Sequence, residues 1–266
     1  MKRRDLMLAA AGLTGAATLP DAAADSGDGI KGKQYYELRK YHLLNRSKQE
    51  GFHNFMRNAA LPAMNRIGIE PVGVFNVMYG PNYPMLAYYL LMPHKSLESF
   101  ASSTSRLLAD TAYLQAGSSF LDAPYGEPLY VRMESSLMVA FDAMPRIEMP
   151  PPAGTREQRI FELRTYESHT AKASKKKIEM FNAGGEIELF RQTGLNPVFF
   201  GETLVGPQMP NLNYMLCFKD MAERDAAWKV FVDSPGWQEL SVKEEYKDTV
   251  SNITDIILRP MEYSQI

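Results

Sequence analysis

A six-residue motif near the start of the chain returns about 125 residues later. Tyr36-Glu37-Leu38-Arg39-Lys40-Tyr41 recurs as Phe161-Glu162-Leu163-Arg164-Thr165-Tyr166, with four identical positions and an aromatic residue first in both copies. Three further pairs follow in the same order at an offset of 125 or 126 residues: Ile69 to Phe75 with Leu195 to Phe200, Gly80-Pro81 with Gly206-Pro207, and Leu86-Ala87-Tyr88 with Leu212-Asn213-Tyr214. Co-linear repeats predict that the 266 residues fold as two copies of one structural unit.

Each copy has the pattern of a β-α-β-β-α-β unit. In the first copy, alternating and apolar segments predict strands over 34–43, 72–79, 85–92 and 131–141. A helix is expected from Ser47, as its N-cap, to Gly68, with Pro62 kinking or splitting it, and a helix or helix pair over 96–121. The second copy repeats the order over 158–166, 172–192, 197–205, 212–218, 221–248 and 252–261. This order predicts an α+β protein of two tandem ferredoxin-like domains.

A proline-rich segment separates the two copies. Four prolines fall between Met144 and Gly154, a composition typical of an extended, semi-rigid linker. The predicted organisation is a first domain over 33–142, a linker over 143–157 and a second domain over 158–266.

Residues 1–24 have the pattern of an export signal. Lys2, Arg3 and Arg4 precede a mildly apolar stretch from Leu6 to Leu19, and Ala22-Ala23-Ala24 supplies small residues for cleavage. That stretch is shorter than the roughly 20 residues that a membrane-spanning helix needs. The paired arginines are typical of twin-arginine (Tat) signals, and a Sec signal or an uncleaved anchor is the alternative interpretation. We therefore expect an exported protein, periplasmic or extracellular, with no transmembrane segment in the mature chain.

Composition narrows the class of protein. With 45% hydrophobic and 11% aromatic residues, the chain has enough apolar side chains to form a core, which excludes a disordered protein. A formal net charge of −2 gives no basic field, so nucleic acid is not expected as a partner. Cys217 is the single cysteine and lies in an apolar run, where a buried, unreactive thiol is expected. Lys175-Lys176-Lys177 opens a helix of the second copy and is expected on a solvated face.

The strand motif, the Gly-Pro hairpin and the duplicated unit together resemble the NIPSNAP family. The residues that carry the resemblance are Tyr36-Glu37-Leu38-Arg39 with Tyr41, Phe161-Glu162-Leu163-Arg164 with Tyr166, and the closing segment Ile256 to Pro260. That family belongs to the dimeric α/β-barrel superfamily, whose other members include cofactor-independent monooxygenases and haem-handling enzymes. The resemblance implies that the two copies pair their sheets face to face, as an intramolecular dimeric α/β barrel. It implies no defined reaction, because NIPSNAP proteins have no well-established one.

Alternation along the two motif strands sorts their side chains onto two faces. One face of each strand carries a glutamate, an arginine and a tyrosine: Glu37, Arg39 and Tyr41 in the first copy, and Glu162, Arg164 and Tyr166 in the second. We expect this polar face to point into the barrel and the apolar face to pack against helices. In the barrel, the six side chains would offer acid–base groups and an anion clamp. The same pattern also suits Glu–Arg ion pairs that fix the sheet, since buried charges must be paired.

The four histidines do not form a metal signature. His42 ends the first strand, where a histidine at a barrel mouth can act as a base or an axial ligand. His53, His94 and His169 are expected at the surface or in helix caps. No pair has the i, i+4 spacing of a helical zinc site, so no metal site is predicted.

The sequence leaves three functions open. The leading interpretation is an exported NIPSNAP-type protein that binds a small molecule or a protein partner through its barrel, as a monomer or a homo-oligomer. The alternative is a monooxygenase-like or isomerase-like enzyme that acts on a small hydrophobic or aromatic substrate in the barrel, using Tyr41, Arg39, His42 or their counterparts. The third is an interaction module that assembles through its sheets or helices. No cofactor is predicted, and the resemblance leaves haem or another small ligand open.

The export signal can be tested by replacing both arginines of the pair with lysine. Arg3→Lys with Arg4→Lys keeps the positive charge and removes the guanidinium pair, so export should be lost if a twin-arginine pathway recognises the leader. The measurement is the fraction of mature protein outside the cytoplasm. Unchanged export of the double variant would contradict the twin-arginine assignment and favour a Sec signal.

Overall fold

The computed structural model describes residues 32–80, 86–151 and 159–266. The predicted signal peptide, residues 1–24, lies outside the described residues, and so do residues 152–158 of the predicted linker. The described part of the linker packs on the fold. Met144 is fully buried, and the Ile147 N–H donates a hydrogen bond to the side-chain Oε1 of Gln34 at 2.8 Å.

Each half of the chain is a β-α-β-β-α-β unit, as the sequence predicts. The elements of the first half are β1 (Tyr35–Leu43), α1 (Gln49–Phe55), α2 (Leu61–Arg66), β2 (Gly73–Tyr79), β3 (Leu86–His94), α3 (Leu97–Leu108), α4 (Thr111–Leu121) and β4 (Arg132–Ala140). Those of the second half are β5 (Ile160–Glu167), α5 (Ala171–Phe181), α6 (Glu186–Gln192), β6 (Asn196–Val205), β7 (Asn211–Phe218), α7 (Met221–Asp233), α8 (Pro235–Ser241) and β8 (Asn252–Pro260). Ser96 and Asp220 begin α3 and α7 in the same way, because each side chain accepts a hydrogen bond from the N–H three residues on.

The helix that contains Pro62 is divided as expected, although it begins differently. A 3-10 turn over Arg46–Lys48 precedes α1, so Ser47 is not the cap of the α-helix. A π-helical turn over Met56–Ala60 joins α1 to α2, and Pro62 lies in the first turn of α2. Because proline has no N–H to donate four residues back, the preceding turn can widen at little cost.

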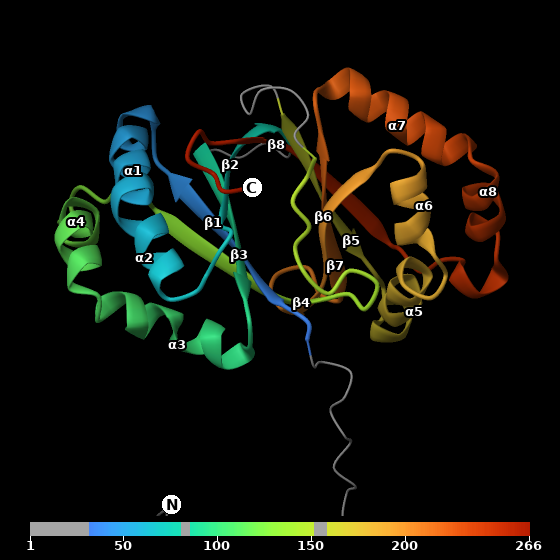
Figure 1. The fold of residues 1–266 in the computed structure, drawn as a ribbon, viewed down its shortest axis with the longest axis horizontal. Coiled ribbons are helices and arrows are strands. Elements are labelled where there is room, and N and C mark those ends of the chain that lie inside the picture. The colour runs from blue at the N-terminus through green and yellow to red at the C-terminus, as the bar shows by residue number, and fades with distance from the viewer. Residues whose placement is uncertain (1–31, 81–85, 152–158) are drawn as a thin grey trace, which may run out of the picture. The chain divides into compact units, whose positions relative to one another are not determined.

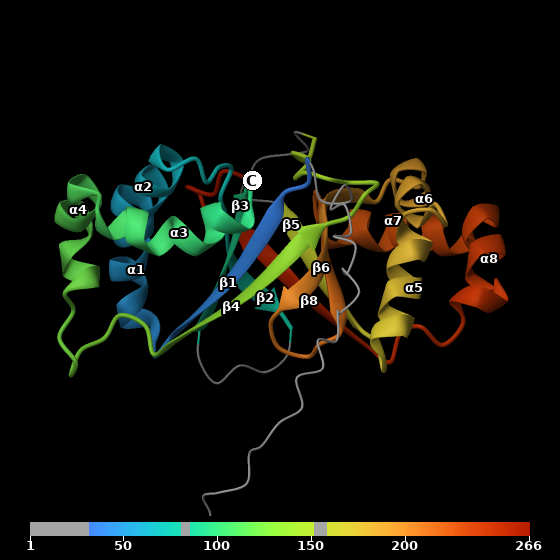
Figure 2. The ribbon, with the colours of Figure 1, turned by 90° about the horizontal axis from the view of Figure 1, so that it is seen from below.

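The eight strands form one closed antiparallel barrel in the order β1-β3-β2-β8-β5-β7-β6-β4 (Figure 1). The two halves meet at two seams, where β2 pairs with β8 and β4 pairs with β6. Helices α1–α4 lie outside the strands of the first half, and α5–α8 lie outside those of the second half (Figure 1, Figure 2). The predicted pairing of the two units as one barrel is therefore confirmed.

Three large apolar clusters fill the space between these layers. One lies inside the barrel and combines side chains of both halves, and the other two lie between the strands and the helices of each half. Inside the barrel, the rings of Phe75 and Phe161 have centroids 4.9 Å apart, and those of Tyr36 and Phe199 are 5.2 Å apart. Each half thus buries aromatic rings against the other half.

The strand register corrects one of the sequence matches between the copies. Arg39 pairs with Leu90 on β3, whereas Arg164, at the same place in the second motif, pairs with Tyr214 on β7. Tyr88 and Tyr214 match in sequence, but Tyr88 pairs with Tyr41 whereas Tyr214 pairs with Arg164, two residues earlier in the motif. A shift of two residues keeps a side chain on the same face of the sheet, so Tyr88 and Tyr214 both face the helices.

The end of the chain binds the first half of the fold. The Met261 N–H donates to the Val74 carbonyl at 2.8 Å, and the Gln265 N–H donates to the Val72 carbonyl at 3.0 Å. The Val72 N–H returns a hydrogen bond to the side-chain Oε1 of Gln265 at 2.7 Å. The last residues thereby continue the seam between β2 and β8.

A double-mutant cycle on Phe75 and Phe161 tests whether the two halves share their core. Phe161→Ala should lower the free energy of unfolding by about 3–5 kcal/mol, because it empties part of the barrel interior. The pair should show a coupling of about 0.5–1.5 kcal/mol in urea denaturation, since the rings are in contact. Phe75 and Phe190, which belong to different apolar clusters, serve as the control pair and should be additive. Two separate unfolding transitions would contradict a shared core.

Candidate functional site

The polar faces of the two motif strands point away from the barrel interior, so that part of the sequence prediction is wrong. Tyr36 and Leu38 lie in the apolar cluster inside the barrel, as do Phe161 and Leu163. The six predicted site residues lie between the strands and the helices: Glu37, Arg39 and Tyr41 on the side of α1–α4, and Glu162, Arg164 and Tyr166 on the side of α5–α8. The structure does not bring the two sets together in one cavity. Both faces of each strand are buried, so alternation separates the faces but does not say which one is inside.

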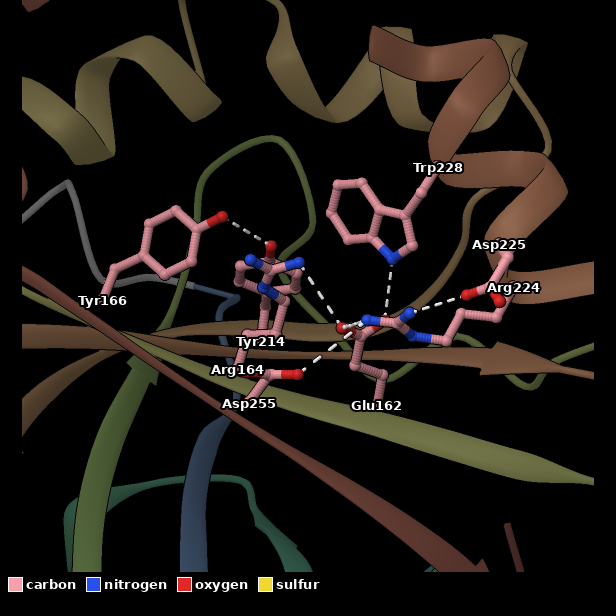
Figure 3. A network of polar contacts seen from close by, with 8 residues as sticks. All are labelled: Glu162, Arg164, Tyr166, Tyr214, Arg224, Asp225, Trp228 and Asp255. Atoms are coloured by element: carbon pink, nitrogen blue, oxygen red, sulfur yellow. Dashed lines mark hydrogen bonds and ion pairs between the residues drawn. The ribbon is translucent and has the colours of Figure 1, made fainter. Parts of the chain in front are cut away.

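In the second half, Glu162 is the centre of a polar network under α7 (Figure 3). Arg224 of α7 donates two hydrogen bonds to its carboxylate, from Nε at 2.9 Å and from Nη2 at 2.6 Å. Trp228, one turn further along α7, donates from Nε1 at 2.8 Å, and Arg164 lies 3.4 Å away on the same strand. The guanidinium of Arg164 also stacks over the Trp228 ring, 4.6 Å from its centroid. This network ties β5 to α7 and fully occupies the carboxylate.

The first half holds Glu37 with different partners. Arg39 Nε and Ser135 Oγ both donate to its Oε1, at 2.7 and 2.8 Å, and His94 Nε2 lies 3.6 Å from Oε2. Burial opposes ionisation of this carboxyl. The imidazole of His94, the charge and hydrogen bond of Arg39 and the hydroxyl of Ser135 outweigh burial and lower its pKa from 4.5 to about 2. Arg224 lies four residues after the cap of α7, and Phe100 occupies the same position after the cap of α3. The rings of Phe100 and His94 pack edge to face.

The tyrosines of the motif lie in aromatic surroundings. Tyr166 accepts a hydrogen bond from the hydroxyl of Tyr214 at 3.0 Å, and Tyr41 packs against Phe52 and Tyr130. Burial raises the pKa of Tyr41 and Tyr166 above the usual value of 10. Both phenols are therefore neutral hydrogen-bonding groups at neutral pH.

Two predictions about charged side chains are corrected by burial. Lys177, expected on a solvated face, is 4% exposed, and its Nζ lies 2.7 Å from the carboxylate of Glu186, which is 2% exposed. The helix turns this lysine inward, where its ammonium also lies 4.5 Å from the centre of the Phe181 ring. His94, expected at the surface, is completely buried behind the start of α3. Cys217 is buried as predicted, and burial raises the pKa of its thiol to about 12.

The side chains that do face the barrel interior change from apolar to polar along the strands. At one end the interior is filled with apolar residues, and at the other end the same alternation presents hydrogen-bonding groups. On β1 the inward sequence is Tyr36, Leu38, Lys40 and His42; on β4 it is Met138, Ser136 and Glu134; on β5 it is Phe161, Leu163 and Thr165; on β7 it is Met215, Asn213 and Asn211; and on β8 it is Leu258, Ile256 and Thr254. Five strands thus build one polar end, which we call the barrel mouth.

A cavity of about 120 Å³ opens at the barrel mouth. Its floor is apolar and is made of Leu38, Leu163 and Ile256. Its walls carry Lys40, Tyr89, Glu134, Ser136, Thr165, Asn211, Asn213 and Thr254, and the β6–β7 hairpin adds Pro207 and Gln208. Both halves of the chain contribute, so the cavity exists only because the barrel is closed.

Hydrogen bonds between side chains fix one wall of the cavity. Asn213 accepts from Thr165 Oγ1 at 2.5 Å and donates to Thr203 Oγ1 at 3.0 Å and to Asn211 Oδ1 at 2.9 Å. Asn211 in turn donates to the carbonyls of Pro207 and Gln208, both at 2.9 Å. This ladder of amides holds the β6–β7 hairpin against the mouth and makes the wall rigid.

His42 is the predicted site residue that the structure places beside this cavity. Its Nε2 lies 2.8 Å from Oε1 of Glu134, one of the lining residues, and the imidazole is 5% exposed. Sequence reasoning missed Glu134, Tyr89 and Asn213, which come from other strands. The signal was present in the inward face of the first motif strand, where Lys40 follows Tyr36 and Leu38 with the same period of two.

Within 32–80, 86–151 and 159–266, no helix is long and apolar enough to cross a membrane. Over the same residues, no three His, Cys, Asp or Glu side chains gather where they could hold a metal ion.

A closed barrel built from two ferredoxin-like units defines a protein of the dimeric α/β-barrel class. The NIPSNAP family model matches residues 36–145 and 161–265, one match for each half. The chain belongs to the NIPSNAP family.

Solved structures agree with this fold. A candidate monooxygenase from Fusobacterium nucleatum is similar with a TM-score of 0.56 at 8% identity, over 86% of this chain and 93% of that one. A candidate monooxygenase from Lactobacillus acidophilus has a TM-score of 0.51 at 10% identity, over 86% and 94%. A NIPSNAP-like domain protein from Burkholderia xenovorans is 21% identical over 41% of this chain and 90% of its own, with a TM-score of 0.37. No curated protein matches the sequence. At these identities the first two structures show the fold alone.

The low pKa of Glu37 predicts an acid-sensitive contribution to stability. Since the folded-state pKa of about 2 lies below the ordinary 4.5, the stabilisation is complete above pH 4.5 and is lost as the pH falls to about 2. Urea denaturation of the wild type and of Glu37→Gln over this pH range measures the effect. The fall in unfolding free energy should be about 3 kcal/mol larger for the wild type than for Glu37→Gln. Glu98→Gln, at an exposed position of α3, is the control and should follow the wild type. Equal losses in the wild type and Glu37→Gln would contradict the assignment.

Proposed function

We propose that this NIPSNAP protein is exported and binds a small polar molecule in the mouth of its barrel. The observation that carries the proposal is the cavity of about 120 Å³, lined by polar side chains of both halves, above an interior otherwise filled with apolar residues. A concave site with a few fixed hydrogen-bonding groups and an apolar floor is the usual form of a small-molecule site.

The size of the cavity limits the ligand. An apolar cavity of about 150 Å³ encloses one benzene molecule, whereas drug-sized ligands take about 300–1,000 Å³. The enclosed volume of about 120 Å³ therefore suits a molecule of about five or six non-hydrogen atoms. A haem does not fit the residues that line it, and the proposal involves no cofactor.

The lining also changes the expected chemistry of the ligand. The sequence suggested a hydrophobic or aromatic substrate, but the walls carry an ammonium, a carboxylate, hydroxyls and amides. An apolar ligand would displace water from these polar groups without replacing its hydrogen bonds, which opposes its binding. The walls therefore favour a ligand with its own donors and acceptors.

A second candidate function is catalysis of a proton transfer in the same cavity. It is favoured by the contact of 2.8 Å between His42 Nε2 and Glu134 Oε1, because a carboxylate that holds an imidazole is a common arrangement for a general base. The fold is shared with structures described as candidate monooxygenases, which supports the barrel as a scaffold for enzymes. If the protein converts a bound ligand into a product, the cavity is an active site.

Ligand binding can be tested by filling the cavity from its rim. Thr254→Phe places a ring in the barrel mouth, while Ile253→Phe adds the same ring on the opposite face of β8 and serves as the control. Titration of the wild type with small polar solutes (acetate, ethylamine, propanol and glycine) should shift the amide resonances of Thr165, Asn213 and Thr254. The shifts should persist in Ile253→Phe and vanish in Thr254→Phe. Shifts elsewhere, or none with any solute, would contradict a site in the barrel mouth.

A further inference from the structure

We infer that the second half of the chain has a further binding site, for a small neutral aromatic molecule, between α5 and the seam of β4 with β6. The site is a cavity of about 340 Å³ that shares no lining residue with the barrel mouth. The inference is carried by the residues that line this cavity and by the first half of the chain, which fills the equivalent place with the ring of Tyr263.

In the first half, the segment that follows β8 packs a tyrosine ring on the helix. The hydroxyl oxygen of Tyr263 lies 2.6 Å from Nδ1 of His53 on α1. The guanidinium of Arg57, in the π-helical turn after α1, lies over the ring, 5.3 Å from its centroid. Arg57 also forms an ion pair with Glu262, the residue before the tyrosine. The ring therefore covers the helix face that carries His53 and Arg57.

The segment that follows β4 takes the same path in the second half. β4 pairs with β6 as β8 pairs with β2, and each pairing continues by one hydrogen bond beyond the strand. The Met261 N–H donates to a carbonyl of β2 at 2.8 Å, and the Phe141 N–H donates to a carbonyl of β6 at 3.2 Å. Two residues further on, the first half has Tyr263 and the second half has Ala143. Ala143 thus occupies the place of the tyrosine.

Helix α5 presents the face that is equivalent to that of α1. The helix residues that pack on the two motif tyrosines are 125 positions apart, namely Phe52 on α1 and Lys177 on α5. The same offset places Ile178 where the first half has His53. It places Asn182 where the first half has Arg57. Ile178 and Asn182 both line the cavity, so the cavity lies on the helix face that the tyrosine ring covers in the first half.

The alanine leaves this helix face open while the backbone stays in place. The Ala143 N–H donates to Oδ1 of Asn182 at 2.8 Å, which holds the segment against α5. Because the side chain of alanine ends at Cβ, it does not reach over Ile178 as the ring of Tyr263 reaches over the first helix. The apolar part of the cavity lining is Val139, Ala140, Phe141, Ile178 and Ala183. An apolar surface that one half covers with an aromatic ring is thus hollow in the other half.

The charged groups of the lining favour a neutral ligand, because they are already paired. Three ion pairs account for them: Lys33 with Asp142 at 2.5 Å, Lys175 with Glu202 at 2.6 Å and Lys176 with Glu179 at 2.8 Å. The amide of Asn182 is also occupied, since its Nδ2 donates to the Ile178 carbonyl at 3.0 Å. A charged ligand would have to displace one of these partners, whereas a neutral ring displaces water from the apolar lining.

The volume and the lining define the ligand further. An apolar cavity of about 150 Å³ encloses one benzene molecule, so about 340 Å³ accepts one aromatic ring with a substituent. Ile178 offers no side-chain hydrogen bond where His53 meets the hydroxyl of Tyr263, so an apolar edge of the ligand ring would lie against Ile178. A polar substituent would then point to the charged rim and keep its contact with water.

The test uses 4-methylphenol, which is the side chain of tyrosine as a free molecule. Titration of the full chain at millimolar concentrations should shift the amide resonances of Ala143, Ile178 and Asn182 until they saturate. Ala143→Tyr, which copies the first half, should fill the cavity and weaken binding about tenfold or more. Ala116→Tyr, which adds the same ring at an exposed position of α4, should bind like the wild type. Thr254→Phe, which fills the barrel mouth, should also bind like the wild type.

Tyr263→Ala supplies a positive control in the same molecule. It removes the ring from the first half, so 4-methylphenol should gain a second site there and shift the resonances of His53 and Arg57. If this variant gains a site in the first half while the wild type shows no saturable shift around Asn182, the second half has no ring site and the inference is wrong.

Two further outcomes would overturn the inference. Binding that Ala143→Tyr leaves unchanged would show that the ligand does not lie in the place of the missing ring. Binding that Thr254→Phe abolishes would assign the ligand to the barrel mouth. The comparison of the wild type with Ala143→Tyr decides the inference even if Tyr263→Ala does not fold.

Discussion

Closure of the two sheets over one apolar interior is the constraint on which the rest of this structure depends. Each half presents a sheet whose inner face is apolar, and the two faces bury Phe75 against Phe161 and Tyr36 against Phe199. The hydrophobic gain from that burial is available only when both halves are present. The seams and the docking of the chain end follow from closure, and so does the cavity at the barrel mouth.

The two halves share one backbone fold, but different side chains hold the equivalent glutamates. In the second half, Glu162 is held by Arg224 and Trp228, whereas in the first half Glu37 has Ser135 and a more distant His94. Both arrangements neutralise a buried carboxylate, which is the physical requirement, but with different donors. The mouth follows the same rule, because the cavity-lining positions that carry Thr165 and Thr254 in the second half carry Lys40 and Glu134 in the first.

Much of the fold follows from local patterns. The repeat of Glu-Leu-Arg with its flanking aromatic residues locates β1 and β5, and the Pro62 segment predicts a broken helix. The ladder around Asn213, the contact of His42 with Glu134 and the burial of Lys177 do not follow, because their partners come from other strands or another helix. Contacts between side chains of different strands have no characteristic spacing along the chain, so they cannot be predicted from a sequence pattern.

The sequence by itself determined that the chain has two copies of one unit and that each motif strand has a polar and an apolar face, because a period of two is a property of the extended chain. Only the tertiary structure decided which face lies inside. Both faces are buried, one by the opposite half and one by helices, so burial alone does not say which face lies inside. The interior needs bulk to fill it, and the large apolar side chains of Tyr36 and Phe161 supply that bulk, while Glu37 and Glu162 find partners outside the barrel. Because Lys40 shares the inward face with Tyr36 and Leu38, its side chain forms part of the cavity wall.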